Sequence, residues 1–193
     1  MKDPTSFDGI TTPVGDYAYE VETQQLSMEQ VRANPSFSRP VQLYDKWCAL
    51  PGTIPHHNTI TPSLIGAEIL SEMYILDVLT RPDNYEPGNN GLDNDDDMPW
   101  DFRWRLFGTT HSERYGKEAT GVLLSDAATH DKSAAGSFEV AQHVMKTHEA
   151  AFFLTKFCEN GAIHKTTSTV VMPLADDNGA VCRLFGCSAW SKF

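Results

Sequence analysis

The sequence has few of the features that mark membrane or secreted proteins. No run of apolar residues approaches the roughly 20 that a membrane-spanning helix needs. The first residues, MKDPTSFDGITT, lack the apolar segment of a signal peptide. We therefore expect a cytoplasmic protein that makes no contact with a membrane.

Basic residues and cysteines are also scarce. The 15 basic residues face 26 acidic ones, and the formal net charge of −11 argues against nucleic acid or anionic lipid as a partner. The four cysteines, Cys48, Cys158, Cys182 and Cys187, include no C-x-x-C pair. This spacing predicts neither a zinc site nor a disulfide framework, and it favours buried thiols in a reducing compartment.

Catalytic and nucleotide-binding motifs are missing as well. Around Gly116-Lys117 a phosphate loop would need glycine where His111 stands and a hydroxyl where Glu118 stands. There is no G-x-S-x-G nucleophile motif. The sequence gives no support for an enzyme, and it identifies no cofactor.

Metal-binding patterns are equally weak. The acidic run 93–97 resembles the start of a calcium loop, but Met98 and Trp104 occupy the positions that require Gly and Glu. The adjacent His56 and His57 are expected to point apart, as neighbours do on a regular element. A single histidine beside an apolar pocket leaves haem ligation open. We predict no metal centre.

The first half of the chain predicts a polar tail, short helices and one strand. Residues 1–25 are polar and read as a tail or a loosely docked arm. Ser27 is placed to begin one helix, and Thr61-Pro62 is placed to begin another. Between them, apolar residues recur at helical spacing over 41–50. The run MYILDVL at 73–79 predicts a buried strand, and 82–99 predicts a long acidic surface loop.

The second half predicts four strands and one long helix. Residues 100–107 alternate with period two, which predicts a strand whose Trp100, Phe102, Trp104 and Leu106 share one buried face. A helix is expected over 134–147 and three antiparallel strands over 150–158, 163–174 and 180–190, with turns at Asn160-Gly161 and 176–179. The simplest packing is an α+β fold with a five-stranded antiparallel sheet and helices on one face.

The chain resembles the PAS superfamily over about residues 43–190, and within it a PAS-like bacterial family of mostly single-domain proteins. The resemblance rests on the order strand, strand, helices and three-stranded meander, and on short motifs in order along the chain. These are Trp47, the stretch PHHNTITP at 55–62, RLFGT at 105–109, Tyr115-Gly116, Gly121, and Met172-Pro173-Leu174. In the second motif His57 stands where the family carries arginine. The resemblance implies residues 1–40 as a tail and helical extension and 41–193 as a PAS-like domain.

The resemblance also implies a function. Such domains sense small molecules or pair with partner proteins, frequently as homodimers, in bacterial signal transduction. Their cavity usually lies between the inner face of the sheet and the helices, where general pocket physics also places one. The residues expected to bind a ligand there are Phe102, Trp104, Arg105, Phe138, Met145, Phe153 and Thr169.

Two other functions remain open. One is an enzyme that acts on a small molecule on a similar curved sheet, with His164 and an acid as a dyad. The other is a ligand-free adaptor with a filled core and an exposed apolar patch. For Arg105, an ordinary pairing with a carboxylate on the sheet competes with a role in holding an anionic ligand.

Overall fold

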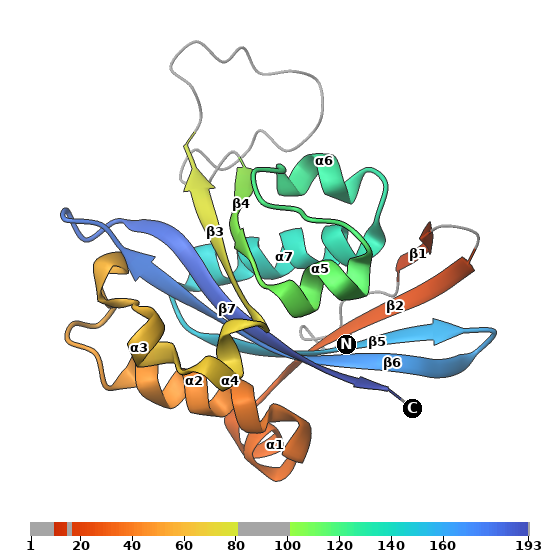
Figure 1. The fold of residues 1–193 in the computed structure, drawn as a ribbon, viewed down its shortest axis with the longest axis horizontal. Coiled ribbons are helices and arrows are strands. Elements are labelled where there is room, and N and C mark those ends of the chain that lie inside the picture. The colour runs from red at the N-terminus through yellow and green to blue at the C-terminus, as the bar shows by residue number, and fades with distance from the viewer. Residues whose placement is uncertain (1–9, 15–16, 81–100, 193) are drawn as a thin grey trace, which may run out of the picture.

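The fold is a strongly twisted antiparallel sheet between two layers of helices (Figure 1). The computed structural model describes residues 10–14, 17–80 and 101–192. In chain order, the strands are β1 (Ile10–Val14), β2 (Tyr17–Leu26), β3 (Met73–Leu79), β4 (Asp101–Phe107), β5 (Ala151–Glu159), β6 (Ala162–Ala175) and β7 (Val181–Lys192). The helices are α1 (Met28–Ala33), α2 (Ser38–Cys48), α3 (Pro62–Ile65), α4 (Ala67–Leu70), α5 (Thr109–Tyr115), α6 (Leu124–Ala128) and α7 (Lys132–Thr147).

Helices cover both faces of the sheet, so the expectation of helices on one face is wrong. Successive strand residues point to opposite faces. Phe152 and Val170 accordingly pack in the cluster with α1–α4, whereas Phe153 and Val171 pack in the cluster with α5–α7. We call the first side the outer face and the second the cavity face. The protein is α+β, as predicted.

The sheet is also wider than predicted. Its strand order within the described residues is β1-β2-β5-β6-β7-β3-β4, which makes seven strands instead of five. The two additional strands come from the segment expected to be a tail. Residues Glu20 to Leu26 of β2 pair with Cys158 to Phe152 of β5, and Val21 is buried. Backbone pairing and burial therefore make this segment an integral part of the sheet.

Strand β4 follows the predicted alternation only as far as Arg105. Leu76 pairs with Trp104 and Ile75 pairs with Leu106, which leaves Arg105 as the extra residue of a β-bulge. After the bulge the alternation is reversed, so Leu106 is exposed and Phe107 is buried. The predicted buried position of Leu106 is therefore wrong.

The free edge of the sheet at β4 is partly covered by the chain that follows α5. The backbone N–H of Trp104 donates to the carbonyl of Val122, and that of Gly121 donates to the carbonyl of Trp104. An isolated bridge joins Arg103 to Leu123. A short segment thus occupies backbone groups that an edge strand would otherwise leave open.

The predicted helix starts at Ser27 and Thr61 are confirmed. Ser27 forms a capping box with Gln30, and the Thr61 hydroxyl accepts from the N–H of Leu64. The helix after Thr61 is broken at Gly66, whose φ of 89° separates α3 from α4. The last three strands and the helix at 132–147 confirm the predictions for the C-terminal half.

Gly108 connects the sheet to the helices on the cavity face. Its N–H donates to the carbonyl of Met73, and a Cβ at this position would lie 2.4 Å from the carbonyl oxygen of Ser71. Only glycine allows this approach of two backbones. Gly108 therefore sets where the chain leaves β4 and enters α5.

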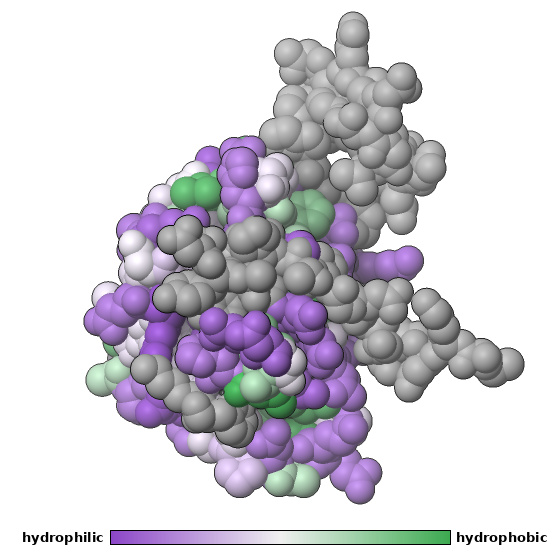
Figure 2. Space-filling view, turned by 90° about the vertical axis from the view of Figure 1, so that its right-hand side faces the viewer, coloured by the Kyte–Doolittle hydropathy of each residue, from purple (hydrophilic) through white to green (hydrophobic). Residues whose placement is uncertain are grey.

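Several expectations concern the surface. Cys187 is buried, but Cys48 is exposed and Cys158 and Cys182 are half-buried, so burial of all four thiols is not observed. The acidic loop 82–99, the calcium-like run within it and Trp100 lie outside the described residues. No helix in the described part of the chain has the length and apolarity to cross a bilayer. Figure 2 shows a mostly hydrophilic face with small hydrophobic patches, in agreement with the acidic composition.

Candidate functional site

A cavity of about 100 Å³ lies on the cavity face, between the sheet and α5–α7. It is lined by β2–β7, by the three helices and by the turn after α5. Its aromatic, acidic, basic and hydroxyl-bearing lining residues are Thr23, Tyr74, Trp104, Phe107, His111, Tyr115, Lys117, Asp131, Ser133, Ser137, Phe153, Thr155, Phe157, Thr167, Thr169, Ser188 and Trp190. An apolar cavity of about 150 Å³ can hold benzene. At about 100 Å³ the present cavity is smaller, so it can enclose a small ligand of a few non-hydrogen atoms or one part of a larger ligand.

One part of the lining is a surface of hydroxyl groups on the sheet. The Oγ1 atoms of Thr23 and Thr155 lie 3.1 Å apart, and Thr169 Oγ1 lies 2.8 Å from Ser188 Oγ. The strands position these side chains because every second residue of β5 and β6 faces the cavity. A hydroxyl can donate one hydrogen bond and accept two, so these pairs retain capacity for a ligand.

The other part of the lining is a series of aromatic rings in contact. Trp104 meets Tyr74 at 5.5 Å and Phe107 at 4.9 Å between ring centroids, both edge to face. Tyr115 continues the series, 5.8 Å from Phe107 and 5.6 Å from Trp190. Such geometry is favourable for aromatic pairs and offers flat apolar surface.

His111 is buried in the wall that these aromatic rings form, and both of its ring nitrogens make hydrogen bonds. Nε2 lies 2.9 Å from the carbonyl oxygen of Glu72, which can only accept, so Nε2 carries the proton. Nδ1 accepts from the indole N–H of Trp190 at 3.3 Å. Burial lowers the pKa of His111, which favours this neutral tautomer. The ring links α5 to β7 and to Glu72, the residue before β3.

The two tyrosines of the wall also stay neutral. Burial raises the pKa of Tyr115 to about 12, and burial also raises the pKa of Tyr74. At the entrance to α7, Asp131 caps the helix by accepting from the N–H and hydroxyl of Ser133. The aromatic and hydroxyl-bearing part of the lining is therefore suited to an uncharged group with a flat apolar surface and hydrogen-bonding atoms, whereas Lys117 and Asp131 are the charged residues of the lining.

The seven residues expected to bind a ligand are divided between three places. Trp104, Phe153 and Thr169 line the cavity. The apolar cluster on the cavity face also includes Phe102, Phe138 and Met145, but these three residues do not line the cavity. Phe102 and Phe138 pack against each other. Arg105 lies on the outer face, where its side chain is 51% exposed and reaches Asp77 at 3.6 Å.

Sequence reasoning missed most of the polar and aromatic lining. His111 and Tyr115 are four apart, one helical turn, and this spacing could have placed both on the same face of α5. The run Thr166-Thr167-Ser168-Thr169 carried the signal for the hydroxyl groups. His164, the residue considered for an enzymatic dyad, is exposed on β6 and does not line the cavity.

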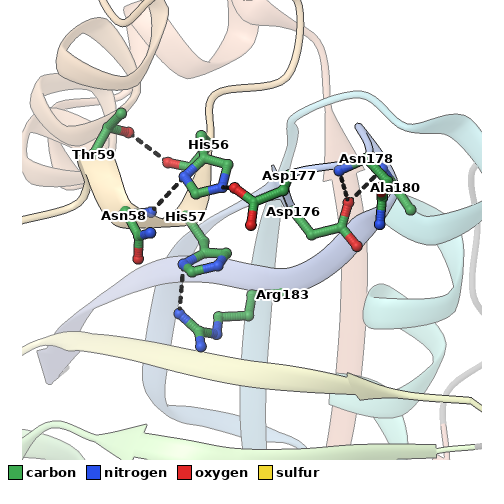
Figure 3. A network of polar contacts seen from close by, with 9 residues as sticks. All are labelled: His56, His57, Asn58, Thr59, Asp176, Asp177, Asn178, Ala180 and Arg183. Atoms are coloured by element: carbon green, nitrogen blue, oxygen red, sulfur yellow. Dashed lines mark hydrogen bonds and ion pairs between the residues drawn. The ribbon is translucent and has the colours of Figure 1, made fainter.

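The histidines at 56 and 57 form a second polar site (Figure 3). Their rings stack at 4.5 Å, so the expectation that they point apart is wrong, because the pair lies at the start of a single 3₁₀ turn.

In the part of the chain that the structure describes, no three His, Cys, Asp or Glu side chains are grouped to hold a metal ion. Comparison of the chain with family models, with curated proteins and with solved structures finds no match.

Proposed function

We propose that the protein is a PAS-like sensory or regulatory module that binds a small uncharged molecule in the cavity between the sheet and α5–α7. The observation that carries this proposal is the cavity itself, which combines a hydroxyl-bearing sheet with a wall of aromatic rings. Binding pockets of this kind are apolar with a few placed polar groups. The order strand, strand, helices and three-stranded meander over 73–192 supports the PAS-like part of the proposal.

Signal output is proposed to pass through the helices that complete the cavity. Residues of α5, α6 and α7 contribute to its lining, whereas the sheet provides the opposite wall. A ligand that binds one arrangement of these helices better than another shifts the population toward it. The recipient would be a partner protein or a second copy of the chain in a homodimer, within bacterial signalling.

Binding is favoured over catalysis by the state of His111. A general base needs a free nitrogen within reach of the substrate. Both nitrogens of His111 are used in contacts between α5 and the sheet. The adaptor function would need an exposed apolar patch, and the exposed large apolar residues among those described are Leu106 and Val122, on and beside β4, and Ile163 on β6.

The test is native mass spectrometry of freshly purified protein, followed by denaturing extraction and an absorbance spectrum of the extract. We expect a bound small molecule that is lost in Ala134→Phe, because Ala134 lines the cavity and the larger ring fills it. The matched control is Ala33→Phe, at an exposed position at the end of α1 on the outer face, which should retain the ligand.

Two outcomes would count against the proposal. A clean protein mass together with no stabilisation by a library of small neutral aromatic and hydroxylated compounds would favour the adaptor. Equal ligand content in Ala134→Phe and Ala33→Phe would place the bound molecule elsewhere.

A further inference from the structure

A cluster of arginines lies on the outer face, on the side of the sheet opposite the cavity. Arg103 Nη2 lies 3.2 Å from Asp77 Oδ2, and Asp77 Oδ1 is 3.3 Å from Arg183 Nε and 3.6 Å from Arg105 Nη1. The four residues come from the neighbouring strands β7, β3 and β4. We call Arg103, Arg105, Arg183 and Asp77 the arginine cluster.

The arginine cluster has more positive than negative charge. Among the described residues, three guanidinium groups share one carboxylate, which leaves a surplus of two positive charges within the arginine cluster. This surplus is unexpected in a chain whose net charge is −11. The nearby Asp177 pairs with His56 at 3.1 Å and is 96% exposed, so water screens its charge.

His57 adds a further donor beside the cluster. Arg183 Nη1 donates to His57 Nδ1 at 3.0 Å, so this nitrogen is unprotonated and the proton of the neutral ring is on Nε2 (Figure 3). Burial and then Arg183 lower the pKa of His57. The stacked His56 is held in turn, since its Nδ1 accepts from the N–H of Asn58. The His57 ring is therefore a fixed neutral donor and adds no positive charge to the arginine cluster.

The exposure of the side chains leaves room for a ligand. Arg103 and Arg105 are 47% and 51% exposed, whereas Asp77 is only 15% exposed. The carboxylate thus lies beneath the guanidinium groups of Arg103 and Arg105 and orients them, and these two side chains stay about half exposed to water, whereas Arg183 is 23% exposed. Planar guanidinium groups bind carboxylate and phosphate through paired hydrogen bonds.

We propose that the arginine cluster binds a doubly charged oxyanion group, such as a phosphate or a dicarboxylate. The surplus of two charges matches such a group, and Asp77 sets the positions of the donors before binding. This site is separate from the cavity and does not depend on the proposed function. Arg105 was expected to hold an anionic ligand in the cavity, and this proposal assigns it an anion on the outer face instead.

The experiment is a titration of the full chain with inorganic phosphate and with succinate, against sodium chloride at matched ionic strength. Calorimetry gives the affinity, and ¹⁵N spectra of the arginine Nε groups identify the arginines that respond. We expect binding by at least one oxyanion, and Arg105→Gln should weaken it about tenfold. The control Arg32→Gln, an exposed arginine paired with Asp45 on α2, should bind as the parent does.

Asp77→Asn separates binding from a structural role. Without an anion this variant should be less stable than the parent, because three guanidinium groups lose their shared carboxylate. It should bind phosphate more tightly than the parent, because the gain of one net positive charge outweighs the loss of the carboxylate that orients the guanidinium groups. A purely structural cluster would show the first effect and not the second.

The results that overturn the proposal are distinct from those that concern the cavity. No heat and no Nε shift with either oxyanion beyond the chloride control would overturn it. Equal affinities for the parent and Arg105→Gln would do the same. Preference for phosphate over succinate, or the reverse, would identify the chemical source of the anion.

Discussion

The two faces of the same sheet are covered in different ways. On the outer face, the covering segments dock directly onto the strands: Phe37 packs on Phe152, and the hydroxyl of Ser36 lies 2.5 Å from that of Ser168. On the cavity face, the hydroxyl groups of Thr169 and Ser188 pair with each other, and the helices stand away from them across a cavity.

This difference shows how one strand serves two purposes. In β6, Ser168 and Val170 point to the outer face, and the alternating Thr169 and Val171 point to the cavity. A hydroxyl that meets a partner from a docked segment contributes to stability. A hydroxyl that meets only its neighbour in the sheet keeps hydrogen-bonding capacity for a ligand. Three predictions test whether the faces differ in this way.

The largest effect is expected at the connection of the cavity-side helices to the sheet. Gly108→Ala should lower the free energy of unfolding by about 3 kcal/mol, because the new Cβ would meet backbone carbonyls of Ser71 and Met73 that cannot easily move. Urea denaturation measures the change. Gly116→Ala is the control: its φ of 68° is unfavourable for alanine, but no atom of the described residues would lie within 4 Å of the new Cβ, so a cost of about 1 kcal/mol is expected. Equal costs would show that the backbone contact at Gly108 is not tight.

A matched pair of substitutions compares the space on the two faces. Val170→Phe should cost about 1–3 kcal/mol, since Val170 is fully buried in the outer-face cluster and a larger side chain forces its neighbours apart. Val171→Phe places the same ring in the cavity and should cost less than about 1 kcal/mol.

Chemical denaturation of both variants gives this comparison directly, since the two residues are adjacent in β6. A larger cost for Val171→Phe than for Val170→Phe would mean that the cavity is closed in solution. A ligand retained by the parent should be lost from Val171→Phe and kept by Val170→Phe.

The smallest effect concerns pH. The pKa of His111 is lowered in the folded protein, whereas in the unfolded chain it is about 6.5. The unfolded chain therefore binds the proton first, so the contribution of neutral His111 to stability is complete above about pH 6.5 and is lost as the pH falls below it. We expect the free energy of unfolding to fall less steeply between pH 8 and pH 5 in His111→Gln than in the parent. Parallel pH profiles would contradict a neutral, buried ring.

The sequence predicted the elements better than the layers. The turn residues Asn160-Gly161 and 176–179 predicted where the C-terminal strands end, and the cap residues Ser27 and Thr61 predicted where two helices begin. The second layer was missed although runs such as AFFL at 151–154 and VVMPL at 170–174 are apolar at every position. Strands of that kind are buried on both faces, which requires cover on both sides.

The site was harder to predict for two reasons. Tyr17–Leu26 has enough polar residues to resemble a tail, yet its period-two pattern with Val21 and Thr23 on one side is that of a strand. The bulge at Arg105 has no local signal, because it arises from the register between β3 and β4. Thr23 in the cavity and Leu106 at the surface both depend on such long-range pairing.

The segment that lies along β4 has a consequence for assembly. An unpaired edge strand can accept a strand from another molecule, by which chains add to one another and aggregate. At Trp104, the N–H and carbonyl that a foreign strand would use are already taken by Val122 and Gly121. Intermolecular extension of the sheet is thus blocked at this point, and a second copy of the chain must associate through side chains and not by continuing the β-ladder there.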